Sequence, residues 1–147
     1  PIYLPGYGYA KVNKQEKQKW GGLIENYLRT SKRLVNVFVL VDMRHEPTDD
    51  DKMLINYLYN YNIPFTIIAT KADKLSRAQQ QKCLATIASA LCVGTKDILV
   101  TSASTKTGKE GVLARIDMLL ENARSVENTY SDENENSNEN AGSAENN

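Results

Sequence analysis

The chain has 147 residues and a mass of 16.5 kDa, a size that fits one domain and is too short for two separate cores. Apolar residues make up 41% and charged residues 24%, and no apolar run approaches the roughly 18 residues that a membrane-spanning helix needs. These numbers argue against a two-domain enzyme and against a membrane protein. We expect a cytoplasmic location.

Charge is distributed unevenly, although 18 Lys and Arg balance 18 Asp and Glu. Residues 1–124 hold all the basic residues and 12 of the acidic ones, a net charge of +6. Residues 125–147 hold six acids, seven Asn and no base. Such a segment cannot bury enough apolar surface to offset its chain entropy. We therefore predict a folded domain over residues 1–124 and a disordered, Asn- and Glu-rich acidic tail over residues 125–147.

Helical and strand-like patterns alternate along the folded part. Apolar residues three and four apart indicate helices, short β-branched runs indicate buried strands, and Thr48 and Ser76 stand where helix caps are expected. In chain order the predicted elements are a helix over 14–30, a strand over 35–41, a helix over 48–63, a strand over 64–70, a helix over 76–91, a strand over 97–101 and a helix over 111–124. This alternation predicts an α/β fold with a mostly parallel sheet, in which ligands bind outside the carboxyl ends of the strands.

Two of the predicted strands run into polar segments that suit a guanine base. After strand 64–70 the sequence reads Thr70-Lys71-Ala72-Asp73. An Asp carboxylate can accept two parallel hydrogen bonds from the N1–H and 2-amino groups of guanine, a donor pair that adenine lacks. The aliphatic stem of Lys71 can cover the base. Taken alone, the four-residue pattern is as typical of the polar start of a helix.

Two further segments are weak signals by themselves. Residues 101–104 (TSAS) follow strand 97–101, and their backbone N–H groups could meet the guanine O6. Near the N-terminus, residues 4–10 (LPGYGYA) carry glycines that let a backbone approach a ligand closely, although a plain turn explains them equally well. The order of the three segments, with an αβ unit's spacing between them, is more specific than any one of them.

Together these motifs resemble the EngB (YihA/YsxC) family of P-loop GTPases. The resemblance runs from Ile2 to about Leu120. LPGYGYAKV is similar to the family's switch II loop, VLVDMRHEPTDDD to its D-x-R-H segment, TKADKL to its base-recognition motif and TSASTKTGKEG to its last guanine-contacting loop. The resemblance implies a three-layer P-loop NTPase fold, a Ras-like G domain, of which residues 1–124 form the C-terminal two-thirds.

The resemblance also implies a function. It implies a GTP-binding switch that assists assembly of the large ribosomal subunit and is required for normal cell division and septation. The implied partners are GTP or GDP and the large subunit or its rRNA, with no membrane, for a monomeric protein. The residues it assigns are Pro5 and Gly6 to the γ-phosphate-sensing loop, Thr70, Lys71 and Asp73 to the guanine, and Thr101, Ser102 and Ala103 to the closing loop. It gives Arg44 and His45 no derivable role, and a loop that braces the sheet through His45, or a solvated arginine, explains them as well.

The sequence departs from the family's pattern in its phosphate chemistry. The 147 residues contain no G-x-x-x-x-G-K followed by Ser or Thr, the loop that cradles phosphates and helps to hold Mg²⁺. Tyr3 stands in place of the Asp of D-x-P-G, and Tyr7 in place of the glutamine that orients water in Ras-like enzymes. We therefore assign no catalytic residue and no metal ligand, and expect Mg²⁺ and slow GTP hydrolysis only in an intact parent protein. The alternative is a nucleotide-independent pseudo-GTPase module that binds the ribosome or rRNA.

Overall fold

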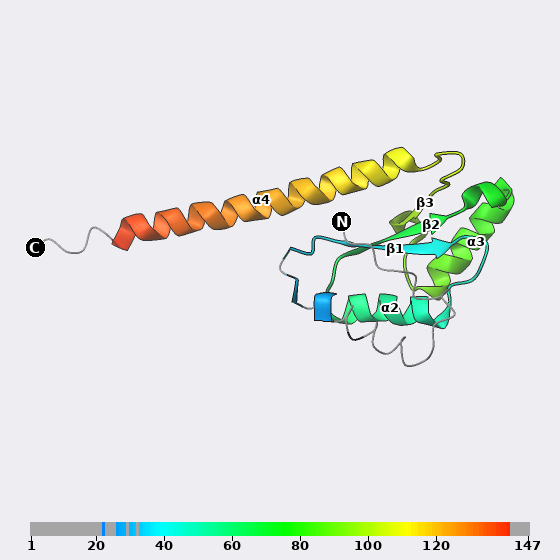
Figure 1. The fold of residues 1–147 in the computed structure, drawn as a ribbon, viewed down its shortest axis with the longest axis horizontal. Coiled ribbons are helices and arrows are strands. Elements are labelled where there is room, and N and C mark those ends of the chain that lie inside the picture. Colours follow the sequence, from blue (N-terminus) through cyan, green and yellow to red (C-terminus); the bar gives the residue numbers. More distant parts are fainter. Residues whose placement is uncertain (1–21, 23–25, 29, 32, 142–147) are drawn as a thin grey trace, which may run out of the picture. The chain divides into compact units, whose positions relative to one another are not determined.

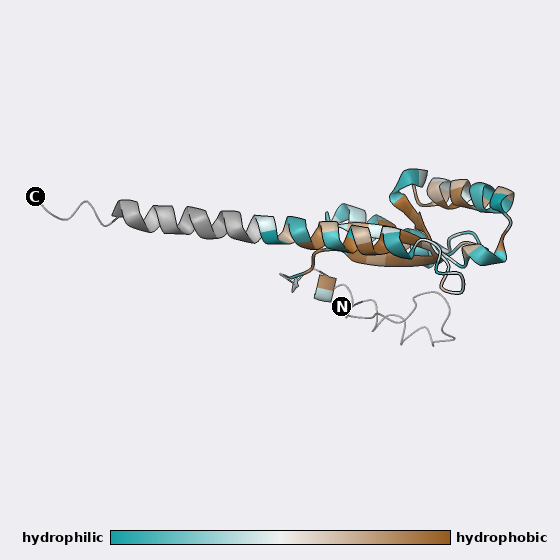
Figure 2. Ribbon diagram, turned by 90° about the horizontal axis from the view of Figure 1, so that it is seen from above, coloured by the Kyte–Doolittle hydropathy of each residue, from teal (hydrophilic) through white to brown (hydrophobic). Residues whose placement is uncertain are grey.

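Three short hydrophobic strands form a parallel sheet in the order β1-β2-β3 (Figure 1). They are β1 (Val37–Asp42), β2 (Phe65–Thr70) and β3 (Ile98–Val100). Val39 pairs with Ile67, which pairs in turn with Ile98, so these side chains point to the same face of the sheet. The strands are brown in Figure 2, as befits a parallel sheet whose strands are apolar along their whole length. The predicted α/β fold with a parallel sheet is confirmed.

The computed structural model describes residues 22, 26–28, 30–31 and 33–141, with side chains up to residue 125. Contacts divide the chain into two units, Pro1–Gly111 and Val112–Asn147. The predicted loop over residues 4–10 and most of the predicted helix over 14–30 lie outside the described residues. Within the part that the structure describes, no helix combines the length and apolarity needed to cross a bilayer.

Helices α2 (Asp49–Asn60) and α3 (Arg77–Ala90) connect the strands, and each begins with a capping box. The Thr48 hydroxyl accepts from the Asp51 N–H at 3.2 Å, while the Asp51 carboxylate accepts from the Thr48 N–H at 2.8 Å. Ser76 and Gln79 exchange the equivalent bonds at 3.4 and 2.9 Å. Since each box satisfies N–H groups that have no partner inside the helix, it fixes where the helix starts. Both helices start where the sequence predicted.

One face of the sheet and the two helices share a hydrophobic core. Leu58 of α2 is completely buried, and Ile67 and Ile87 are each 1% exposed. Other members of the same cluster are Val39, Val41, Met43, Ile55, Ala69, Ala88, Leu91 and Ile98. Burial of an aliphatic side chain stabilises a fold by about 1.5–3 kcal/mol. The cluster therefore fixes the position of the strand ends, where the predicted site residues lie.

Helix α4 (Lys109–Ala141) is longer than predicted. The sequence predicted a helix over 111–124 and disorder from Ser125, but the backbone of residues 125–141 is helical. Extending an existing helix needs no new nucleus, and no Gly or Pro interrupts residues 112–141. The predicted disorder of residues 125–147 stays a prediction. The predicted domain boundary at residue 124 stays a prediction.

Candidate functional site

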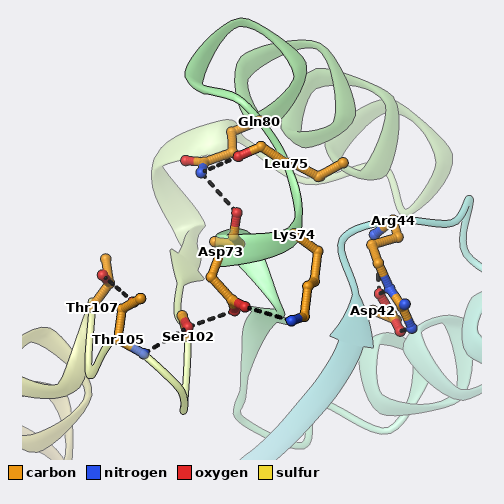
Figure 3. A network of polar contacts seen from close by, with 10 residues as sticks. Asp42, Arg44, Asp73, Lys74, Leu75, Gln80, Ser102, Thr105 and Thr107 are labelled. Atoms are coloured by element: carbon orange, nitrogen blue, oxygen red, sulfur yellow. Dashed lines mark hydrogen bonds and ion pairs between the residues drawn. The ribbon is translucent and has the colours of Figure 1, made fainter.

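The carboxyl ends of the three parallel strands place three polar segments at one edge of the sheet. Residues 42–44 begin at the last residue of β1, residues 71–74 follow β2 and residues 101–107 follow β3. Figure 3 shows side chains from all three segments at this edge. Open α/β folds bind ligands at this edge, so it is the candidate functional site.

Asp73 and Ser102, which are 29 positions apart in the sequence, meet at this edge (Figure 3). The Ser102 hydroxyl donates to Asp73 Oδ1 at 2.6 Å and accepts from the Thr105 N–H at 3.2 Å. Lys74 Nζ lies 3.3 Å from the other carboxylate oxygen, Asp73 Oδ2. The side chain of Asp73 is 12% exposed, while Ser102 is 3% exposed. The structure thus brings together the two loops that the sequence predicted to close over one base.

The charge of Asp73 is stabilised by its partners. The Ser102 hydroxyl lowers the pKa of Asp73 below its ordinary value, desolvation of the carboxylate opposes this, and Lys74 adds to the lowering. A hydrogen bond donated to a carboxylate favours its ionised form. Asp73 is therefore an anionic acceptor at neutral pH, as recognition of two N–H donors requires.

The turn that carries Asp73 is held from two sides. Lys71 adopts a left-handed backbone conformation with φ +63°, and the 3₁₀ turn Ala72–Lys74 follows it. The Ala72 N–H donates to the Thr101 carbonyl at 3.1 Å. From α3, Gln80 Nε2 donates to the carbonyls of Ala72 and Leu75 at 2.8 and 3.1 Å (Figure 3). Sequence reasoning missed Gln80, because nothing in its spacing indicates that its amide reaches back to the turn.

Two backbone N–H groups at the start of the loop after β3 have partners within the fold. The Thr101 N–H donates to the Ala69 carbonyl at 2.8 Å, and the Ser102 N–H to the Thr107 carbonyl at 3.0 Å. These two N–H groups are therefore not available to a base, contrary to the expectation for the whole segment. Among the described residues, no acceptor lies in hydrogen-bonding range of the Ala103 N–H. Thr70, the last residue of β2, donates its hydroxyl to the Val41 carbonyl at 3.0 Å and so ties two strand ends together.

Asp42, at the end of β1, is a site residue that sequence reasoning missed. Its carboxylate accepts from the Arg44 N–H and Nε at 3.0 Å each, from Arg44 Nη2 at 2.7 Å and from Lys71 Nζ at 2.9 Å. Its place at the end of a run of apolar strand residues was the available signal. Neither interpretation left open for Arg44 and His45 describes the structure: the His45 side chain is exposed, and Arg44 binds the carboxylate at the end of β1.

The two carboxylates give the fold a predictable dependence on pH. Arg44 holds the pKa of Asp42 well below its usual range; partial burial opposes this effect, and Lys71 reinforces it. A carboxyl group whose pKa is lower in the folded state than in the unfolded state stabilises the fold at pH values above its unfolded pKa, which is about 3.9 for Asp. The stability that Asp42 contributes is therefore complete at neutral pH and is lost as the pH falls below about 4. We expect urea denaturation from pH 7 to 3 to show a smaller decline for Asp42→Asn than for the wild type. Equal declines in both proteins would contradict the assignment.

Two of the predicted site residues belong to the N-terminal loop. Pro5 and Gly6 lie outside the described residues. Within the described part, no group of three or more His, Cys, Asp or Glu residues is arranged to hold a metal ion.

Comparison with solved structures identifies the class of fold. A crystal structure of a probable GTP-binding protein EngB superposes with a TM-score of 0.67 at 18% sequence identity, covering 80% of this chain and 76% of that one. The α/β fold with its parallel sheet is thus shared with that crystal structure. No family model matches the sequence.

Curated relatives extend the comparison to the sequence. A probable GTP-binding protein EngB from Clostridioides difficile is 46% identical over 110 residues, which is 74% of this chain and 54% of that protein. The corresponding protein of Caldanaerobacter subterraneus is 40% identical over 120 residues, which is 82% of this chain and 62% of that protein. The chain belongs to the EngB family of GTP-binding proteins. It spans between about half and three-fifths of the length of these relatives.

Proposed function

We propose that this chain forms the guanine-recognising part of a GTP-binding switch protein. The observation that carries the proposal is the Asp73 carboxylate, which is anionic, largely buried and joined to Ser102 of the facing loop at 2.6 Å. A single carboxylate that faces the edge of a base distinguishes guanine from adenine, because only guanine presents two adjacent N–H donors. Membership of a family of GTP-binding proteins supports the same conclusion.

We propose that a base binds the acceptor directions of Asp73 that remain open. One oxygen of the carboxylate accepts from Ser102, the other lies 3.3 Å from Lys74 Nζ, and the backbone N–H of Asp73 adds a further bond to the carboxylate. The N1–H and 2-amino hydrogens of guanine are assigned to the acceptor directions that these bonds leave. The Ala103 N–H, which lacks an acceptor among the described residues, is the donor for the guanine O6. The stem of Lys71 covers the base, and Thr70 and Thr101 hold the two loops at the strand ends.

The finer proposals rest on the family. We propose that the switch acts in the cytoplasm as a monomer, in assembly of the large ribosomal subunit and in normal cell division. The net charge of +6 on residues 1–124 suits an rRNA partner. Pro5 and Gly6 are assigned to the γ-phosphate. Mg²⁺ and slow GTP hydrolysis belong to the proposal only together with a phosphate loop, which is the part that holds the β- and γ-phosphates in such enzymes.

The test of base recognition uses the 147-residue chain and nucleoside monophosphates. Without a phosphate loop we expect binding in the millimolar range, which amide chemical shifts of the ¹⁵N-labelled chain detect. GMP is expected to shift the amides of residues 71–75 and 101–107, while AMP at the same concentration leaves them in place. Equal shifts with GMP and AMP would remove the proposal. No shift with either, together with RNA binding that falls steeply with salt, would favour the nucleotide-independent module.

A second measurement extends the test to the phosphates. The protein for this measurement is a chimera in which the part of the Clostridioides difficile relative that precedes the matched region is joined to Pro1. Calorimetry on this chimera is expected to show GDP and GTP binding much more tightly than GMP binds the shorter chain, with no comparable binding of ATP. Equal affinities for ATP and GTP would show that the base site does not discriminate guanine from adenine.

A further inference from the structure

Asp42 holds two cations at the rim of the proposed base site. Arg44 donates three hydrogen bonds to the carboxylate, two from its guanidinium group and one from its backbone N–H, all within 3.0 Å. Lys71, which follows the neighbouring strand, donates a fourth from Nζ to Oδ2. The Asp42 side chain is 13% exposed, whereas those of Arg44 and Lys71 are 40% and 53% exposed. The carboxylate is thus the most buried member of the group, and Lys71 is the most exposed.

We propose that Asp42 is a positioning residue of the base site, which acts by holding the ammonium of Lys71 so that the stem of Lys71 lies across the face of the guanine. The inference rests on the proposed function, since it assigns a role within the same site. Asp42 itself does not touch the base in this assignment.

The backbone of Lys71 alone does not fix its side chain. Its left-handed φ of +63° sets the direction in which the stem leaves the turn, but a lysine stem has four rotatable bonds. At an exposure of 53%, the ion pair with Asp42 contributes little to folding stability. The effect of the ion pair is to reduce the number of conformers that the Lys71 side chain adopts. The aliphatic stem of Lys71 then already lies in the binding position when a base arrives. Binding is then stronger because less side-chain entropy is lost when the base arrives.

Removing the charge of Asp42 has a double effect. Asparagine loses the attraction for Lys71, and it no longer places a negative charge between the ammonium of Lys71 and the guanidinium of Arg44. Both effects drive Lys71 away from the β1 end. Asp49, which pairs with Lys52 at 3.5 Å and is fully exposed on α2, offers a matched control for loss of one acidic charge.

A double-mutant cycle tests whether Asp42 acts through Lys71. We expect Asp42→Asn and Lys71→Met each to weaken GMP binding by roughly three- to tenfold in the amide-shift titration, and the double variant to bind no more weakly than Lys71→Met alone. Asp49→Asn is expected to bind GMP like the wild type. Effects of Asp42→Asn and Lys71→Met that multiply, or an Asp42→Asn variant with wild-type affinity, would overturn the positioning role.

A readout without nucleotide separates this inference from the proposed function. The ¹³C relaxation of the Lys71 ε-methylene is expected to report a restrained group in the wild type and in Asp49→Asn, and a mobile one in Asp42→Asn. If the ε-methylene is equally mobile in all three proteins, the inference is overturned regardless of the result of the GMP titration. A restrained Lys71 in a chain that shows no GMP shifts would instead mean that the proposed function fails, and the assignment of Asp42 to base binding fails with it. The amide spectrum of Asp42→Asn shows at the same time whether that variant is folded.

Discussion

With Asp73 changed to asparagine, the chain is expected to lose its preference for guanine and to prefer xanthine. The asparagine oxygen still accepts the N1–H of either base, but its amide N–H now faces the position that the carboxylate oxygen Oδ2 occupied. Opposite the 2-amino group of guanine, this places two donors against each other. Xanthine carries a carbonyl at that position, so that the amide and the base form a matched pair.

The expected size of the effect is a loss of GMP affinity by roughly tenfold or more, the loss typical when a paired set of hydrogen bonds to a base edge is broken. Titrations of wild type and Asp73→Asn with GMP, XMP and AMP, followed by amide shifts at residues 71–75 and 101–107, measure the change. The two side chains have nearly the same shape, so the Ser102 hydroxyl keeps an acceptor and the turn is expected to stay folded. A variant that binds GMP as the wild type does would show that Asp73 does not face the base.

The proximity of Asp73 to Ser102 could be predicted because it follows from topology. In a parallel sheet, every segment that leaves the carboxyl end of a strand lies at the same edge, so a motif after β2 and a motif after β3 come close however far apart they are in the sequence. The helix starts could be predicted for a local reason, since a capping box is a four-residue pattern, seen at Thr48 and Ser76.

The supporting contacts could not be predicted in the same way. Gln80 reaches two carbonyls of the Asp73 turn only because of the angle at which α3 leaves that turn, which no local pattern encodes. The partnership of Asp42 with Lys71 depends on the left-handed backbone of Lys71. Similarly, the N–H groups of Thr101 and Ser102 were assigned to a base because the sequence does not show that the loop turns back to residue 107. Motifs predicted the site's location, and tertiary packing determined which groups remain free to act.

Replacing Gly108 with alanine is expected to be the most damaging single change in the loop after β3. Gly108 has φ +74°, and a β-carbon built there would lie 2.1 Å from the Val100 carbonyl oxygen and 3.1 Å from Thr101 Cγ2. The neighbouring atom is backbone of the β3 strand end and cannot rotate away, so the loop or the strand must move. Left-handed strain and overpacking together are expected to lower the free energy of unfolding by about 2–4 kcal/mol. Urea denaturation of the two proteins measures the difference.

Gly111→Ala supplies the matched control for this prediction. Gly111 lies in the first turn of α4, and nothing stands within 4 Å of a β-carbon built on it. Because alanine favours helix more than glycine does, this variant is expected to be unchanged or more stable by up to about 1 kcal/mol. The displacement caused by Gly108→Ala also reaches the site, since the loop that it closes holds Ser102 through the Thr107 carbonyl. We therefore expect Gly108→Ala, and not Gly111→Ala, to move the amide resonances of Ser102 and Asp73; equal spectra and equal stabilities for the two variants would contradict this account of the loop.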